Sequence, residues 1–274
     1  MTGNQRGSND RIVSAALASA ELPKKLAYGT RAVINGFWLG ALSDEQLCAL
    51  DERYYAREPI YRTSDWNEQG LFDWEEKLVH EHFPRDGTLV VLGSGGGREV
   101  LALRRDGYDA VGYESHPELA AFADEFLTAH GHPSRSHHVA RDSFPDDTGE
   151  CGGVIVGWAA YSLIHGRDRR VALLRSARAH LPRGGHVLVS FFEQRRGDRE
   201  ARVTRTLANG LRRLRGAGPV ELGDTLRPNL IHVFNPAELT DEASAAGFDV
   251  VAHEITQELE ASMQYAAAVL TAGA

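Results

Sequence analysis

The residues best suited to chemistry form a glycine-rich turn after a short apolar run. Residues 89–92 read Leu-Val-Val-Leu, which is typical of a buried strand, and Gly93, Gly95 and Gly97 follow at alternate positions. A backbone without Cβ atoms can approach a ligand closely and adopt positive φ angles. The helix expected after this turn would offer free N–H groups to a carboxylate or phosphate. The turn therefore predicts a cofactor site.

The spacing of the glycines narrows the choice of cofactor. A dinucleotide fingerprint has glycine at its first, third and sixth positions, but the sixth position here is Arg98. An acidic residue, Glu114, stands 17 positions after Gly97, at the end of the next apolar run. A nicotinamide-dependent oxidoreductase would also place an acid there. Arg98 disfavours that alternative, as does the absence of a recognisable Tyr-x-x-x-Lys pair.

The order of motifs over residues 88–192 resembles the cofactor-binding half of class I S-adenosylmethionine-dependent methyltransferases. The resemblance implies S-adenosylmethionine as cofactor and S-adenosylhomocysteine as product. It also implies that Glu114 accepts hydrogen bonds from the ribose hydroxyls, that Asp142 accepts one from the adenine amino group, and that Trp158 lies beside the sulfonium. The full set of expected cofactor-binding residues is Gly93, Ser94, Gly95, Gly97, Glu114, Ser115, Asp142, Ser143 and Trp158.

One position departs from the family pattern. Many members have an acidic residue two positions before the first glycine, where it acts on the methionine amino group indirectly, but this chain has Val91. The amino group would then be held by backbone carbonyls near Gly93 or by a side chain from elsewhere, such as Glu75 or an aromatic residue of the N-terminal region.

The acceptor side of the site is predicted less sharply. Methyl transfer from a sulfonium needs mainly alignment and exclusion of water, so no metal is expected, and the histidine pairs lack ligand spacing. If the acceptor must lose a proton, His165 and His232 are the candidate general bases, whereas a carboxylate acceptor would need none. Rings that could enclose a substrate are those of Tyr55, Tyr61, Trp66 and Tyr161.

Strands alternate with helical patterns from residue 88 to 192, which predicts a parallel sheet with crossover helices. With the resemblance, the expected fold is α/β, with a Rossmann-like, mostly parallel seven-stranded sheet and helices on both faces. We expect an N-terminal helical cap or lid over residues 1–75 and a methyltransferase core over 76–274. An arginine-rich helical insertion is expected at about 193–228, and Phe248–Val251 and Met263–Leu270 should form an antiparallel pair at one edge.

Composition limits the possible partners. The formal net charge of −8 disfavours binding to nucleic acid. Eight arginines nevertheless concentrate between Arg195 and Arg215, and they could form either a solvated helix face or a contact for an anionic partner. Apolar runs are too short to span a membrane, the start MTGNQRGSND is not a signal peptide, and two cysteines fit a reducing compartment. We therefore expect a cytoplasmic protein, and the N-terminal helices could pair two subunits in a homodimer.

Together these features predict a methyltransferase that acts on an oxygen, or a nitrogen, of a small molecule or short peptide. A role in tailoring a natural product is an expectation by analogy of fold. The alternatives are a Rossmann-type NAD(P)-dependent oxidoreductase and a non-catalytic protein that binds S-adenosylmethionine.

Overall fold

The computed structural model describes residues 27–146, 148–195, 199–260 and 263–273. The chain divides into two compact units. The helical unit comprises, among the described residues, 27–43 and 199–225; the sheet unit comprises 44–195 and 226–273 with the gaps given above. The expected boundary at residue 75 therefore differs from the observed one, because the segment from Asp44 onward folds with the sheet. Residues 1–26 of the expected cap lie outside the described residues.

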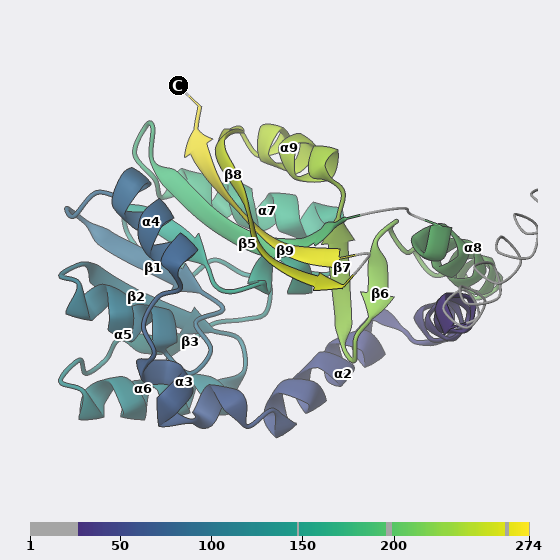
Figure 1. Cartoon of the computed structure of the whole chain (residues 1–274), viewed down its shortest axis with the longest axis horizontal. Coiled ribbons are helices and arrows are strands. Elements are labelled where there is room, and N and C mark those ends of the chain that lie inside the picture. Colours follow the sequence, from purple (N-terminus) through teal and green to yellow (C-terminus); the bar gives the residue numbers. More distant parts are fainter. Residues whose placement is uncertain (1–26, 147, 196–198, 261–262, 274) are drawn as a thin grey trace, which may run out of the picture. The chain divides into compact units, whose positions relative to one another are not determined.

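Nine strands are hydrogen-bonded in one sheet among the described residues (Figure 1). Parallel pairing gives the order β3-β2-β1-β4-β5-β7, and β9 pairs antiparallel with both β5 and β8. The strands are β1 (Thr88–Leu92), β2 (Asp109–Glu114), β3 (Ser136–His138), β4 (Gly153–Val156), β5 (His186–Gln194), β6 (Asp224–Leu226), β7 (Leu230–Phe234), β8 (Phe248–Glu260) and β9 (Met263–Ala272). The mostly parallel α/β fold is confirmed. The count exceeds the expected seven, and strands as short as β3 and β6 carry no periodicity that a sequence can reveal.

Both faces of this sheet are buried. Along β1, Leu89 and Val91 belong to one apolar cluster, whereas Val90 and Leu92 belong to another. Successive side chains of a strand point to opposite faces, so apolar residues at every position mean that helices cover both. The helices are α5 (Arg98–Arg105), α6 (Pro117–Ala129), α7 (Arg167–Ala179) and α9 (Pro236–Ala245). None of the helices described is long and apolar enough to cross a membrane.

The segment before β1 is helical, as expected, and belongs to the sheet unit. It consists of α2 (Asp44–Arg57), the 3-10 turn η1 (Ile60–Arg62), α3 (Ser64–Glu68) and α4 (Asp73–His82). A second 3-10 turn, η2 (Ala160–Leu163), follows β4. The carboxylate of Asp51 on α2 accepts the backbone N–H of Leu230 at 3.2 Å, which ties α2 to β7. Such bonds explain why the boundary lies at residue 44.

The helical unit contains a helix over residues 27–41 and α8 (Arg199–Leu214). Two glycines four residues apart allow these helices to touch. A Cβ on Gly36 would lie 2.8 Å from Leu207 Cβ, and one on Gly40 would lie 2.7 Å from Leu211 Cβ. Arg212 is buried and donates to the carbonyls of Leu39 (3.0 Å) and Gly218 (2.8 Å). Part of the arginine cluster therefore caps backbone carbonyls instead of forming a solvated face.

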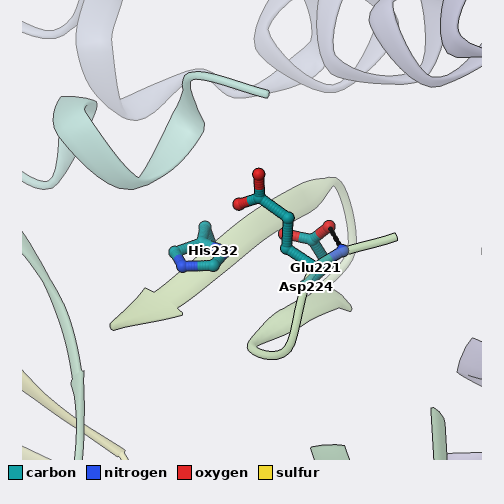
Figure 2. A group of neighbouring side chains, drawn as sticks. All are labelled: Glu221, Asp224 and His232. Carbon is teal, nitrogen blue, oxygen red and sulfur yellow. Dashed lines mark hydrogen bonds between the residues drawn. The ribbon is translucent and has the colours of Figure 1, made fainter. Parts of the chain in front are cut away.

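After α8 the chain makes a turn in which the backbone N–H of Glu221 donates to Asp224 at 2.8 Å (Figure 2). This turn precedes β6.

Replacing Gly40 with alanine should weaken the helical unit. The new methyl group would overlap Leu211, and overpacking of this kind costs about 1–3 kcal/mol. Urea unfolding of Gly40→Ala measures the loss. Gly210→Ala on α8 is the matched control, because nothing lies within 4 Å of its Cβ position, and it should hold or raise stability by up to about 1 kcal/mol. Equal stability of the two variants would contradict the close helix contact.

A buried carboxylate joins three strands on the antiparallel side of the sheet. Glu193 on β5 accepts from His253 Nε2 on β8 at 2.6 Å and from the amide of Gln264 on β9 at 3.1 Å. The hydrogen bond to Glu193 raises the pKa of His253 above 6.5, although burial acts in the opposite direction.

This pair should make stability depend on pH. Because the pKa of His253 is higher in the folded chain, its contribution is complete below its unfolded pKa and is lost as pH rises through the folded pKa. His253→Gln should therefore lower the free energy of unfolding more at about pH 5.5 than at about pH 8.5. Urea unfolding of both proteins across this range measures the difference. A loss that is constant with pH would rule out the charged pair.

Candidate active site

A cavity opens in the sheet unit where β1, β2 and β4 end. Its lining combines residues from these strand ends with residues from α2, η1 and the loop before η2. Of the expected site residues, Gly93, Gly95, Glu114, Ser115, Asp142, Ser143, Trp158, Tyr55 and Tyr61 line it. A smaller pocket shares Gly93, Gly95, Tyr61 and Trp158 with this cavity and adds Ser94 and Trp66. The two hollows therefore adjoin at the glycine turn.

The turn between β1 and α5 depends on glycine at four of its five positions from residue 93 to residue 97. Gly93, Gly95 and Gly97 have φ angles of 65°, 56° and 100°, which strain any residue with a Cβ. Gly96 has ordinary φ but no space, because a Cβ would lie 1.9 Å from the carbonyl oxygen of Tyr61. Gly97 lines neither hollow and serves as the N-cap of α5. Sequence reasoning did not single out Gly96, since the constraint comes from η1.

Glu114 is held in one orientation at the end of β2. One carboxylate oxygen accepts the backbone N–H of Gly95 at 2.9 Å, and the other accepts that of His116 at 2.8 Å. Each oxygen keeps a lone pair, because a carboxylate has about four acceptor positions. The carboxylate therefore braces the glycine turn and can accept two hydroxyl groups from a ligand in the cavity.

Asp142 also lines the cavity and lies in a turn with φ of 56°. Its carboxylate is largely buried and lies 3.4 Å from Arg169 and 3.8 Å from Arg141. Arg141 also lines the cavity, and it was not among the residues predicted from the sequence.

His165 does not line the cavity but contacts Arg141, which does. Its Nε2 is 2.8 Å from the buried carboxylate of Asp51, which also pairs with Arg141. Its Nδ1 is 4.0 Å from the Cys48 sulfur, within hydrogen-bonding range for a thiol. Both ring nitrogens thus have partners within the protein, and the imidazole orients Asp51 and Arg141.

Two other expected residues lie in the core. His232, on β7 (Figure 2), is 2% exposed; its ring packs edge-on against Phe234, and its Nε2 lies 3.7 Å from Glu238. Tyr161, expected on a substrate wall, is instead completely buried, stacks on Phe234 and donates to Glu242 at 2.8 Å. Neither lines the cavity. Their burial is not an effect of alternation, because three consecutive side chains of β7 are buried and Tyr161 lies in the 3-10 turn η2.

Aromatic rings connect the two hollows. Trp158 follows β4, and its ring centroid is 5.4 Å from that of Trp66 and 5.0 Å from that of Tyr265. Tyr61 lies between Tyr55 and Trp66, with centroid distances of 5.8 and 6.1 Å. Burial raises the pKa of both Tyr55 and Tyr61, so their phenols stay neutral near pH 7. The rings form an apolar wall with hydroxyl groups that can donate hydrogen bonds.

A buried ion cluster lies beside the smaller pocket. Arg98 makes two hydrogen bonds of 2.7 Å to Glu75 on α4 and one of 2.7 Å to Glu99 on its own helix. It also donates to the carbonyl of Gly70, and its guanidinium lies over the Phe72 ring at 4.3 Å. Burial lowers the pKa of Arg98, but the two carboxylates outweigh this and raise it, so the guanidinium stays charged. Local sequence pattern does not reveal this cluster, because Glu75 is 23 residues from Arg98.

Comparisons with known proteins agree with this geometry. A family model described as "Methyltransferase domain" matches residues 63–253, which is more than half of the chain. The chain belongs to this methyltransferase family. A search of the curated proteins by sequence found no match.

Solved structures show the same fold. A SAM-dependent methyltransferase from Methanosarcina mazei is 14% identical with a TM-score of 0.58, over 74% of this chain and 99% of that one. The Burkholderia thailandensis 1,6-didemethyltoxoflavin-N1-methyltransferase, solved with bound 1,6-didemethyltoxoflavin and S-adenosylhomocysteine, is 16% identical with a TM-score of 0.58, over 85% of this chain and 92% of that one. The CcbJ methyltransferase of Streptomyces caelestis is 19% identical with a TM-score of 0.53, over 73% and 88%.

The enzyme is thus an S-adenosylmethionine-dependent methyltransferase. Its cavity fits that cofactor, because the glycine turn leaves a cradle free of Cβ atoms that lines both the cavity with Glu114 and Asp142 and the smaller pocket. Within the pocket, the Ser94 hydroxyl has no hydrogen-bond partner among the described residues. Glu114 would hold the ribose, Asp142 the adenine, and the glycine turn the methionine part.

Replacing Glu114 with glutamine should weaken cofactor binding. One of its two oxygens becomes an NH₂ group, which faces a backbone N–H instead of accepting from it and no longer accepts a ribose hydroxyl. We expect the Kd of S-adenosylhomocysteine, measured by calorimetry, to rise about tenfold or more. Glu125→Gln, at an exposed position of α6, is the control and should bind normally. Unchanged affinity in Glu114→Gln would refute this role.

Proposed function

We propose that this methyltransferase transfers a methyl group to an oxygen, or a nitrogen, of a small molecule or short peptide in a biosynthetic tailoring step. The observation that carries the proposal is the aromatic wall of Tyr55, Tyr61 and Trp158 in the cofactor cavity. Tyr55 and Tyr61 come from α2 and η1, ahead of the β-sheet, so this segment can cover an acceptor beside the cofactor. Rings and neutral hydroxyls suit a compact, partly apolar acceptor.

Methyl transfer from a sulfonium depends little on general acid or base catalysis. When bound, S-adenosylmethionine supplies a methyl group already activated by its sulfonium. The chain's own contribution is to align the acceptor, exclude water and hold the loop after β4 in place. That loop is fixed by Ser190, which accepts the N–H of Ala159 at 2.6 Å and donates to the carbonyl of Gly157 at 3.1 Å. Because His165 and His232 lie outside the cavity lining, we propose an acceptor that is nucleophilic without their help.

Charge and a structural relative support a small acceptor. The formal net charge of −8 disfavours the phosphate backbone of a nucleic acid. The Burkholderia relative is named for methylation at a nitrogen of 1,6-didemethyltoxoflavin, which keeps nitrogen open as the alternative to oxygen. A cytoplasmic location and a homodimer stay predictions.

Methyl transfer can be tested with labelled cofactor and separate acceptor panels. We expect label from methyl-tritiated S-adenosylmethionine in a phenol, carboxylate, amine heterocycle or short peptide, and none in DNA or transfer RNA. Tyr55→Ala should lower kcat/KM for the acceptor about tenfold or more by removing part of the wall, whereas Tyr54→Ala, next in sequence but outside the cavity lining, should not. Label found in nucleic acid alone would overturn the proposal.

A further inference from the structure

The smaller pocket holds a carboxylate with an unused oxygen. The Glu99 side chain is 8% exposed and lines this pocket beside Gly93, Gly95 and Trp158. One of its oxygens accepts from Arg98 at 2.7 Å and from the backbone N–H of Trp158 at 3.3 Å. Among the described residues, the other oxygen has no hydrogen-bond partner. A carboxylate so deeply buried is costly unless its acceptor positions are satisfied.

The charges around Glu99 do not balance. The cluster contains two carboxylates, from Glu75 and Glu99, but only one guanidinium, that of Arg98. Both oxygens of Glu75 are already used, by Arg98 and by the backbone N–H of Phe72 at 2.8 Å. The unmatched acceptor capacity therefore belongs to Glu99 and faces the pocket. A cationic donor would supply both the missing charge and the missing hydrogen bond.

The position of the pocket indicates which cation. Glu114 and Asp142 line the larger cavity, which suits the ribose and adenine, whereas the smaller pocket shares the glycine turn with that cavity but neither of these two carboxylates. A ligand that spans both hollows would place its amino-acid end in the smaller one. The cofactor carries one primary ammonium group, at that end. The rings of Tyr61, Trp66 and Trp158 also line the pocket and favour a cation.

We propose that Glu99, held in place by Arg98 and the Trp158 N–H, binds the α-ammonium group of the cofactor's methionine moiety. Glu99 then does from the first turn of α5 what this chain cannot do from β1, where Val91 is buried among apolar side chains. Arg98 and Glu75 are positioning residues, because they orient the carboxylate without touching the cofactor. The inference concerns the cofactor and is independent of the acceptor.

Binding of cofactor analogues tests this assignment without turnover. S-adenosylhomocysteine keeps the ammonium group and lacks the sulfonium charge, its deamino analogue lacks both, and 5′-methylthioadenosine lacks the whole amino-acid part. Calorimetry should show that Glu99→Gln weakens S-adenosylhomocysteine by about tenfold to a hundredfold. It should change the Kd of the deamino analogue and of 5′-methylthioadenosine by less than about threefold. The glutamine oxygen can still accept from Arg98 and Trp158, so the surrounding structure should persist.

Controls separate this role from general damage. Glu76→Gln, an exposed position on α4, should leave all three affinities unchanged. If Glu99→Gln does not fold, Glu99→Asp keeps the charge on a shorter side chain and should weaken S-adenosylhomocysteine several times more than its deamino analogue. Equal loss for all three ligands would mean a structural role only and would overturn the proposal. So would unchanged S-adenosylhomocysteine binding with loss of S-adenosylmethionine binding alone, since Glu99 would then face the sulfonium.

Discussion

Burial of the Arg98 guanidinium between two carboxylates governs the arrangement of the active site. The side chain is 2% exposed and joins α4, through Glu75, to the start of α5, where Glu99 lies. Removing water from these charges costs several kcal/mol per ion, and the loss of one partner from such a pair typically costs about 3–5 kcal/mol. The cluster therefore holds the segment before the sheet against the glycine turn in one defined position.

Close backbone approaches complete this arrangement. Gly96 lets the Tyr61 carbonyl approach the turn, and Gly157 lets the loop after β4 approach the carbonyl of Gly93, where a Cβ would lie 2.6 Å away. Gly112 leaves space for the Ser94 side chain beneath the turn. Each contact excludes a side chain at one position, so the shape of the cavity depends on glycine at these positions as well as on the side chains that line it.

The cavity and the smaller pocket beside it combine three kinds of chemistry. Carboxylates at Glu114 and Asp142 suit hydroxyl and amino donors, the aromatic rings around Trp158 suit an apolar acceptor, and Glu99 suits a cation. These groups come from the ends of β1, β2 and β4 and from the segment that precedes the sheet. Parallel strands bring their carboxyl ends to one edge, which explains why residues far apart in sequence share one site.

Much of this could be predicted from the sequence because it depends on local pattern. Apolar runs, glycine spacing and the acid at the end of the second strand predicted the fold class and the cofactor, and most of the residues predicted to bind it, including Glu114 and Asp142, line one cavity. The start of α9 is likewise determined locally, by the capping box of Asn235 and Glu238 with Pro236 at the first helical position. Short-range preferences of this kind depend on only a few consecutive residues.

Only the tertiary structure decided which polar side chains face the cavity. His165 and Tyr161 follow β4 as a substrate-facing loop would, but one pairs with Asp51 and the other enters the core. Glu99 is oriented by the Trp158 N–H and by Arg98, which Glu75 on α4 holds, and Arg141 is oriented by Asp51 on α2. The direction of a side chain depends on which distant groups satisfy its charge and hydrogen bonds, and that choice exists only once the chain has folded.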